Sequence, residues 1–140
     1  MVWLYCHGGF EMNILQYPHA ALTTRCKSAF SVLKADLDLM FRLMEENNGV
    51  ALSANQVGLN AYFFITSWGQ IFVNLRLLGY KGDYVQSKEG CLSLAGKQFL
   101  RRRRECITTS AGSFEGDKAI IIQHELDHLN GYEVWHERSV

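Results

Sequence analysis

The sequence predicts a single α+β domain, because two amphipathic helical segments alternate with short strand-like segments in a chain of 140 residues. Hydrophobic residues make up 48% of the chain and charged residues 20%, as in an ordinary globular protein. We find no repeat, linker or low-complexity segment. We therefore expect residues 1–140 to form one domain. Residues 1–11 are expected to be an extension outside the core, since Met12 opens a more regular sequence.

The first predicted helix covers residues 28–46, with Ser28 as its N-cap and Asn48-Gly49 as its end. Three segments rich in aromatic and β-branched residues predict strands at 61–66, 71–78 and 99–109. Residues 49–58 are mostly small and predict a turn-like loop before the first of these strands. The helix is supported by apolar residues at helical spacing, namely Leu33, Leu37, Met40, Phe41 and Met44.

The second predicted helix covers residues 118–129, between a cap at Asp117 and an end at Asn130-Gly131. It contains an HExxH pattern, His124-Glu125-Leu126-Asp127-His128. Residues four apart lie on one helix face, so both imidazoles can bind one metal ion. The adjacent glutamate can take a proton from a water molecule whose pKa the metal lowers to about 7. The pattern therefore predicts a metal-dependent hydrolase.

A surface helix with two solvated histidines is the main alternative to the metal site. The three residues Ile120, Ile121 and Ile122 precede the motif and indicate that the helix is largely buried. Histidines and carboxylates on a buried helix need partners or a metal ion. We therefore favour the metal site.

The third ligand is expected upstream of the helix. The pattern HExxHxxGxxH would place a histidine at 134, which is Val134, and Glu133 and Glu137 are too close to fold back around the ion. Of the upstream histidines and cysteines, Cys91 is favoured by its setting, Glu89-Gly90-Cys91-Leu92-Ser93. A glycine allows close approach of backbone, and a thiolate is a strong ligand. Four others remain as alternatives: His7, His19, Cys26 and Cys106.

The overall composition excludes several other classes of protein. The net charge is 0, and alternate arginines of Arg101–Arg104 point to opposite faces of a strand, so we expect a solvated strand and no nucleic-acid partner. Four irregularly spaced cysteines indicate reduced thiols. There is no membrane-length apolar run and no signal peptide, so we expect no membrane partner and a cytoplasmic location.

Three segments together resemble peptide deformylases. That family carries a GφGLAAxQ loop (φ is apolar), an EGCLS turn and a QHExDHLxG helix, in this order. The corresponding segments here are Gly49–Gln56, Glu89–Ser93 and Gln123–Gly131, and the last two match fully. The family removes the formyl group from the N-terminal formylmethionine of nascent chains. The resemblance implies small antiparallel sheets around a central helix that carries HExxH, plus one N-terminal helix.

The resemblance also implies roles for individual residues. Cys91, His124 and His128 correspond to the ligands of the metal ion, natively Fe²⁺, with Zn²⁺, Ni²⁺ or Co²⁺ as substitutes. Glu125 corresponds to the general acid and base. The Gln56 side chain and the Leu92 backbone N–H correspond to the donors that bind the formyl oxygen.

The resemblance extends to residues around these groups. It pairs Glu89 with Arg103 in a salt bridge that orients the cysteine turn. The residues expected to contact the substrate are Gly49, Val50, Ala51 and Leu92, beside which the substrate adds as a strand, and Ile120 and Ile121, which are candidates for the methionine pocket.

Several positions depart from the family pattern. Ala51 replaces a glycine and Ser53 an alanine, while Ala95 replaces a proline and Gln98 a substrate-contacting arginine. Only 12 residues follow His128, so ribosome docking by the family's C-terminal helix is not available. Short forms of this kind resemble deformylases of phage and marine origin, which implies a virus-encoded enzyme that acts in a bacterial host cytoplasm.

Two other functions remain open from the sequence. One is an HExxH metallopeptidase of different specificity, and the other is a catalytically decayed homologue that only binds peptides. A third alternative, nucleic-acid binding through Arg101–Arg104, predicts association that weakens strongly with salt.

Overall fold

The structure, a computed structural model, describes residues 6–7 and 10–136. Its strands are β1 (Cys6–His7), β2 (Phe10–Glu11), β3 (Ala51–Ser53), β4 (Phe63–Thr66), β5 (Ile71–Val73), β6 (Leu77–Gly90), β7 (Gln98–Thr109) and β8 (Gly112–Glu115). Its helices are α1 (Lys34–Glu46) and α2 (Gly116–Leu129), with short 3₁₀ helices η1 (Ala20–Thr23) and η2 (Ala54–Val57). The predicted extension at 1–11 lies largely outside the described residues.

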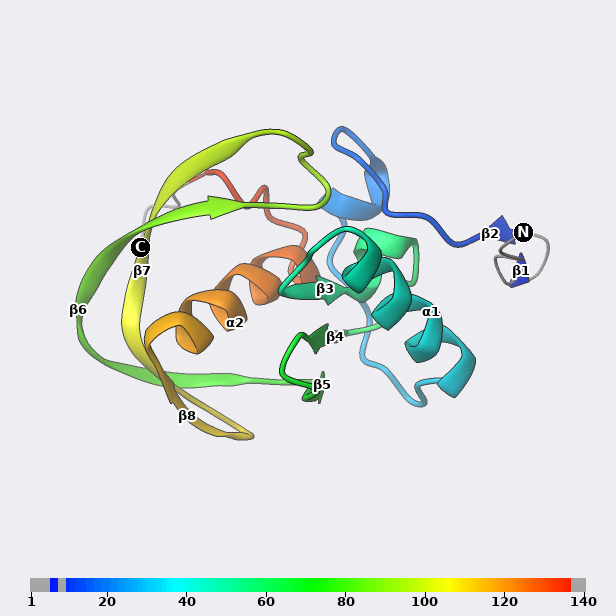
Figure 1. The fold of residues 1–140 in the computed structure, drawn as a ribbon. Helices are drawn as coiled ribbons and strands as arrows, with labels where there is room; N and C mark the ends of the chain where they lie inside the picture. Colours follow the sequence, from blue (N-terminus) through cyan, green and yellow to red (C-terminus); the bar gives the residue numbers. More distant parts are fainter. Residues whose placement is uncertain (1–5, 8–9, 137–140) are drawn as a thin grey trace.

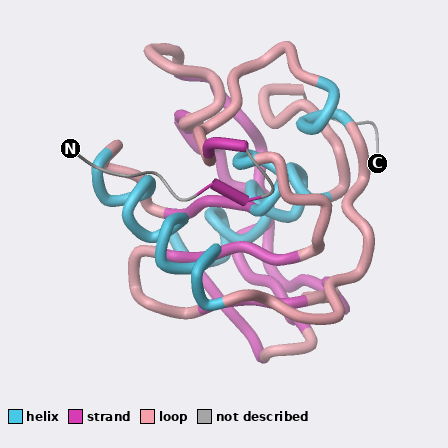
Figure 2. Tube along the Cα trace, turned by 90° about the vertical axis from the view of Figure 1, so that its right-hand side faces the viewer, coloured by secondary structure: helices cyan, strands magenta, loops and turns pink. Residues whose placement is uncertain are grey.

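All strand pairs are antiparallel, in the orders β1-β2, β3-β4-β5 and β6-β7-β8. The long β6–β7 ribbon curves around α2, which lies between this ribbon and the β3–β5 sheet (Figure 1). Figure 2 shows α1 along one edge of the molecule and long connections without helix or strand along the opposite edge. The predicted α+β class with small antiparallel sheets is therefore confirmed.

Two groups of buried apolar side chains hold these layers together. One packs α1 onto β3 and β4, through residues such as Met40, Leu52 and Ile65. The other packs α2 onto the sheets, through residues such as Phe64 and Ile122. Burying side chains of this size contributes about 1.5–3 kcal/mol each. The second group fixes the position of the helix that carries HExxH.

The first helix begins at Lys34 with Leu33 as its N-cap, so the predicted start at Ser28 is wrong. The reason is a long-range contact that periodicity does not reveal. The Asn74 side chain accepts a hydrogen bond from the Ala29 N–H and donates one to the Ala29 carbonyl, both at 2.8 Å. These bonds hold Ala29 beside Asn74 and replace the bonds that a helix would supply.

The predicted strand at 71–78 is divided in two. Asn74 has a φ of 53°, so β5 ends at Val73 and β6 begins at Leu77. Most of β6 is exposed, and it therefore lacks the alternation of apolar residues that marks a strand. The predicted loop at 49–58 contains β3 and η2, because the small buried residues fit closely beside α2.

The second helix begins at Gly116 with Glu115 as its N-cap, two residues before the predicted start. Its predicted end at Asn130-Gly131 is confirmed. Gly131 has a φ of 77°, and an added Cβ would lie 2.8 Å from the Arg25 backbone nitrogen. The chain therefore requires glycine here. Neither helix of the described part of the chain has the length and hydrophobicity of a membrane-spanning segment.

Candidate active site

Three donor side chains from α2 and the end of β6 converge on one point. The sulfur of Cys91 and one ring nitrogen each of His124 and His128 all lie within 4.8 Å of one another. Cys91 Sγ is 3.2 Å from His128 Nε2. Both histidines are buried, whereas Cys91 is partly exposed. The structure thus brings together the three residues predicted as ligands.

The local folds explain why these side chains meet. His124 and His128 lie one turn apart on the same face of α2. Cys91 directly follows β6, and a hydrogen bond of 3.0 Å from the Leu94 N–H to the Cys91 carbonyl closes the turn. The pairing of β6 with β7 holds this turn over the helix. Each donor is therefore attached to an ordered element.

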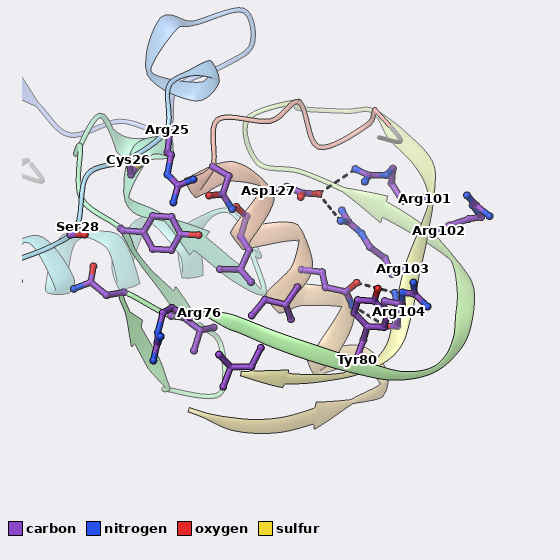
Figure 3. Close-up of a pocket in the computed structure, with 18 of the residues that line it drawn as sticks. Arg25, Cys26, Ser28, Arg76, Tyr80, Arg101, Arg102, Arg103, Arg104 and Asp127 are labelled. Carbon is purple, nitrogen blue, oxygen red and sulfur yellow. Dashed lines mark hydrogen bonds and ion pairs between the residues drawn. The ribbon is translucent and has the colours of Figure 1, made fainter. Parts of the chain in front are cut away.

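His124 is oriented by a buried chain of charges. Its Nδ1 lies 2.8 Å from Glu89 Oε1, and Glu89 also accepts two hydrogen bonds from Arg103, at 2.8 and 2.9 Å. Arg103 continues to Asp127 at 2.6 Å, and Arg101 contacts the same carboxylate at 3.4 Å (Figure 3). Arg101 also donates to the carbonyl of Val134.

The buried charges bear on two predictions, the solvated strand at Arg101–Arg104 and the pair of Glu89 with Arg103. Arg101 and Arg103 are 5% and 3% exposed, so the predicted solvated strand is wrong for these two residues. Their face of β7 is covered by α2, and Asp127 compensates the cost of burying two cations. The predicted pair of Glu89 and Arg103 is present. Burial raises the pKa of Glu89, but its bonds to Arg103 and His124 outweigh this and lower the pKa to about 2.

His128 is oriented from the other side. The Tyr17 hydroxyl lies 3.3 Å from His128 Nδ1 and 3.5 Å from the Tyr132 carbonyl. The Tyr17 ring packs edge-on against Trp135, with ring centroids 4.6 Å apart. The Asn55 side chain donates to the His128 carbonyl at 2.6 Å. With Nδ1 occupied in this way, Nε2 is the nitrogen that faces Cys91.

Gln56 and Leu92 border the same point. The side-chain oxygen of Gln56, Oε1, accepts hydrogen bonds from the Ser53 backbone N–H and hydroxyl, at 2.9 and 3.0 Å. Its amide nitrogen is therefore directed toward Ser93 Oγ at 3.1 Å and Cys91 Sγ at 3.7 Å. The Leu92 N–H has no hydrogen-bond acceptor within residues 6–7 and 10–136. Both groups can donate to an oxygen beside Cys91.

Glu125 lies next to the donor group and is 4% exposed. Its Oε2 has no hydrogen-bond partner among the described residues, an uncommon state for a buried carboxylate oxygen. Burial raises the pKa of Glu125 to about 7, although His124 and Ser53 act in the opposite direction. A carboxyl group with a pKa near neutrality can accept a proton and return it.

The electrostatics of the two histidines differ. Burial opposes protonation of His124, but the hydrogen bonds to Cys91 and Glu89 outweigh it and raise its pKa to about 10. Burial and the positive charge of His124 lower the pKa of His128. The thiol and Glu89 thus favour positive charge at this point, which a bound cation would supply.

A cleft of about 1170 Å³ opens onto these groups. Among its lining residues are all of those predicted to contact substrate, namely Gly49, Val50, Ala51, Leu92, Ile120 and Ile121. Gln98 also lines it, at the position of the family's arginine. Gly49 has a role that the sequence does not reveal, since an added Cβ would lie 2.7 Å from Leu92 Cδ1. The absence of a side chain at Gly49 leaves room for the Leu92 side chain.

Several supporting residues were not predicted from the sequence. Tyr17 precedes the single proline and has no motif that marks it, and Arg101 is indistinguishable from its neighbours in the arginine run. Asp127 lies inside the HExxH pattern, and its burial could be expected from the apolar residues before it. Asn55 and Ser93 lie within the family segments and could have been considered there.

The donor set fits a single divalent metal ion. A thiolate with two imidazoles suits iron, zinc, nickel or cobalt. The His124 and His128 rings are both fixed through their second nitrogen, as is usual for metal-bound histidines. The fold and this site define a metal-dependent hydrolase of the HExxH type, with the thiol of a strand-end cysteine beside the two histidines.

Comparison with known proteins defines the family. A family model described as "Polypeptide deformylase" matches residues 11–139, and the chain belongs to this family. The chain is 33% identical over 138 residues to the peptide deformylase of Chromobacterium violaceum, covering 86% of this chain and 82% of that protein. It is 28% identical to that of Borreliella burgdorferi over 137 residues, covering 86% of this chain and 83% of the relative.

Solved structures agree with this assignment. The peptide deformylase of Thermotoga maritima superimposes with a TM-score of 0.84 at 27% identity, covering 92% of this chain and 98% of that one. A Synechococcus elongatus peptide deformylase in complex with actinonin gives 0.80 at 26% identity, covering 94% and 80% respectively. Members of the family are metal-dependent hydrolases that remove the N-formyl group from nascent chains, and this is the function of the protein.

Proposed function

We propose that Cys91, His124 and His128 hold one Fe²⁺ ion for hydrolysis of N-formylmethionyl peptides, with Zn²⁺, Ni²⁺ and Co²⁺ as substitutes. The convergence of these three donors within 4.8 Å carries the proposal. When bound, the ion lowers the pKa of water and stabilises negative charge on the substrate oxygen. The preference for iron rests on the family, since zinc is an equally suitable partner for these ligands.

Glu125 serves as the proton carrier in this proposal. Its carboxylate takes a proton from the attacking water as the water oxygen bonds to the formyl carbon. It then gives the proton to the amine nitrogen as the carbon–nitrogen bond breaks, leaving formate and a free N-terminus. The buried, unpartnered Oε2 and the pKa near 7 support this role.

Gln56 and Leu92 stabilise the formyl oxygen. The formyl oxygen gains negative charge as the formyl carbon becomes tetrahedral. The Gln56 amide and the Leu92 N–H, already in position, bind the oxygen more tightly in that state. Such donors typically contribute about 2.7–4 kcal/mol each in acyl transfer. The hydrogen bonds from Ser53 that fix the Gln56 amide support this role, because they hold it before substrate binds.

The substrate lies in the cleft beside Gly49, Val50 and Ala51. Val50 is 55% exposed and belongs to the rim, whereas Ala51 is buried in β3. Ala51 nevertheless lines the cleft, so its methyl group borders the substrate. Ile120 and Ile121 are both partly buried and both line the cleft, as a pocket for the methionine side chain requires.

We also propose that the chain forms a single catalytic domain with α2 as its central support. The two apolar groups share the β3–β4 sheet, and α2 contacts β3, β7 and β8. The protein acts on nascent chains in the cytoplasm, where these chains emerge.

The decisive experiment compares formyl-Met-Ala-Ser with the same peptide without the formyl group. The protein is purified anaerobically, its metal content is measured, and formate and peptide products are quantified. We expect formate from the first peptide and no product from the second. Cleavage at an internal peptide bond would instead identify a metallopeptidase, and binding without turnover would identify a peptide-binding homologue.

A further inference from the structure

Figure 3 shows a second cleft, of about 1070 Å³. Its lining residues on α2 differ from those of the catalytic cleft, so it lies along a different face of the helix. The residues of α2 on this face are Gln123, Leu126 and Asp127, followed by the C-cap Asn130, at successive spacings of three, one and three. The cleft is completed by parts of β6 and β7 and by the segment 25–28. We call it the basic cleft. Arg101, Arg103 and Asp127 support His124 from this face, and the other lining residues have no part in the proposed reaction.

The basic cleft concentrates positive charge in a protein whose net charge is 0. Seven of the 14 basic residues line it, namely Arg101–Arg104, Arg25, Lys27 and Arg76, against a single carboxylate, Asp127. Asp127 is already engaged by Arg101 and Arg103. The catalytic cleft, by contrast, is lined by two lysines and three carboxylates. Such a concentration favours an anionic ligand in the basic cleft over one in the catalytic cleft.

Four of these cations are available to such a ligand. Arg25, Lys27 and Arg76 are exposed, and no ion pair within residues 6–7 and 10–136 includes them or Arg104. They come from three separate segments of the chain, so they are distributed around the cleft. A ligand with several separated negative charges matches this distribution better than a single small anion.

Arg104 is held by aromatic rings in place of a carboxylate. Its guanidinium carbon lies 3.7 Å from the centre of the Tyr80 ring and 3.8 Å from that of Tyr84. Stacking of this kind occupies the flat faces of the group and leaves its N–H edge for hydrogen bonds. The Tyr80 ring is 52% exposed and that of Tyr84 is 36% exposed. This part of the basic cleft therefore presents both a cation, Arg104, and two exposed aromatic rings.

From this arrangement we propose that the basic cleft binds single-stranded nucleic acid. Arg25, Lys27, Arg76 and Arg104 contact phosphates, and bases stack on Tyr80 and Tyr84. A single strand exposes both its phosphates and the faces of its bases, which this combination requires. An acidic peptide would use the cations but has no need of the rings, and a duplex hides its base faces.

The test measures binding of a fluorescein-labelled ten-nucleotide oligo(U) by anisotropy at 50 to 200 mM salt. Four phosphate contacts on a single strand predict that the dissociation constant rises about 50-fold across this range. Oligo(dT), a duplex of the same length and a poly-glutamate peptide are measured in parallel. The two single strands should bind most tightly. Equal or tighter binding of the peptide, or no binding of any single strand at 50 mM salt, overturns the proposal.

Matched variants locate the site. Arg25→Glu/Arg76→Glu should weaken oligo(U) binding at least tenfold and reduce its salt dependence. Lys34→Glu/Arg42→Glu, on α1, makes the same change in charge outside the cleft and should leave affinity within twofold. Tyr84→Leu should weaken binding roughly tenfold through lost stacking. Equal losses in both charge variants would show diffuse attraction and refute the site.

Formate release from formyl-Met-Ala-Ser serves as the folding control, since none of these substitutions touches the catalytic cleft. A basic-cleft variant that still releases formate but no longer binds oligo(U) supports the basic cleft as the nucleic-acid site. Absence of formate release in the wild-type protein would contradict the proposed catalytic roles and leave the result for nucleic acid unaffected.

Discussion

The two clefts on α2 use charge in opposite ways. The catalytic cleft is supported by buried, paired charges that run from Arg101 and Asp127, which also line the basic cleft, through Arg103 and Glu89 to His124. On the basic side the cations are mostly exposed, and one is held by aromatic rings. The first arrangement fixes atoms for chemistry, whereas the second can adapt to a flexible partner. One helix supports both because its faces carry different residues.

The largest expected effect separates chemistry from binding on the catalytic side. Glu125→Gln keeps the shape of the side chain but removes its ability to accept a proton. We expect formate release to fall by roughly 10²–10⁴-fold, with metal content unchanged by elemental analysis. Oligo(U) affinity should stay the same. A variant that retains the wild-type rate would exclude Glu125 as the proton carrier.

A smaller effect is expected from the support of His128. Tyr17→Phe removes the hydroxyl that lies 3.3 Å from Nδ1 but keeps the ring against Trp135. Loss of such an outer partner typically weakens metal binding by 10–100-fold, and we expect roughly tenfold here because Asn55 still fixes the His128 backbone. Competition with a chromophoric chelator measures this directly. The matched variant Tyr132→Phe leaves the carbonyl in place and should bind metal like the wild type.

The smallest effect concerns stability on the side of the basic cleft. Burial raises the pKa of the Cys26 thiol from 9.0 to about 11. The folded protein therefore keeps this proton to higher pH than the unfolded chain, and the free energy of unfolding falls as the pH rises from 9 toward 11. Cys26→Ala lacks this contribution. Urea unfolding of both proteins at pH 7, 9 and 10.5 should show a flatter decline for the variant, and parallel declines would contradict the assignment.

The sequence predicted most of the catalytic side and little of the basic side. HExxH specifies two ligands through helix geometry, and the EGCLS segment identifies Cys91, so local patterns were sufficient there. The basic cleft combines Arg25, Arg76 and Arg104 from distant segments, which only the fold brings together. The start of α1 was wrong for a related reason, because the bonds between Asn74 and Ala29 join residues 45 positions apart.

The arginine run shows the same limit within one strand. Strand alternation correctly divides Arg101–Arg104 between two faces. It cannot indicate that the inner face is covered by α2 and supplied with Asp127, which turns Arg101 and Arg103 into buried structural residues. Tyr17 could not be predicted either, since its role depends on the path of the chain before α1.

The two ends of the Gln56 side-chain amide link folding of the chain to formation of the active site. Its oxygen completes the capping box of η2 with Ser53, while its nitrogen faces Cys91. The amide cannot rotate to release one interaction without losing the other. Formation of this turn during folding and alignment of the catalytic donor are thus a single event, so a folded molecule in which the donor points elsewhere should be rare.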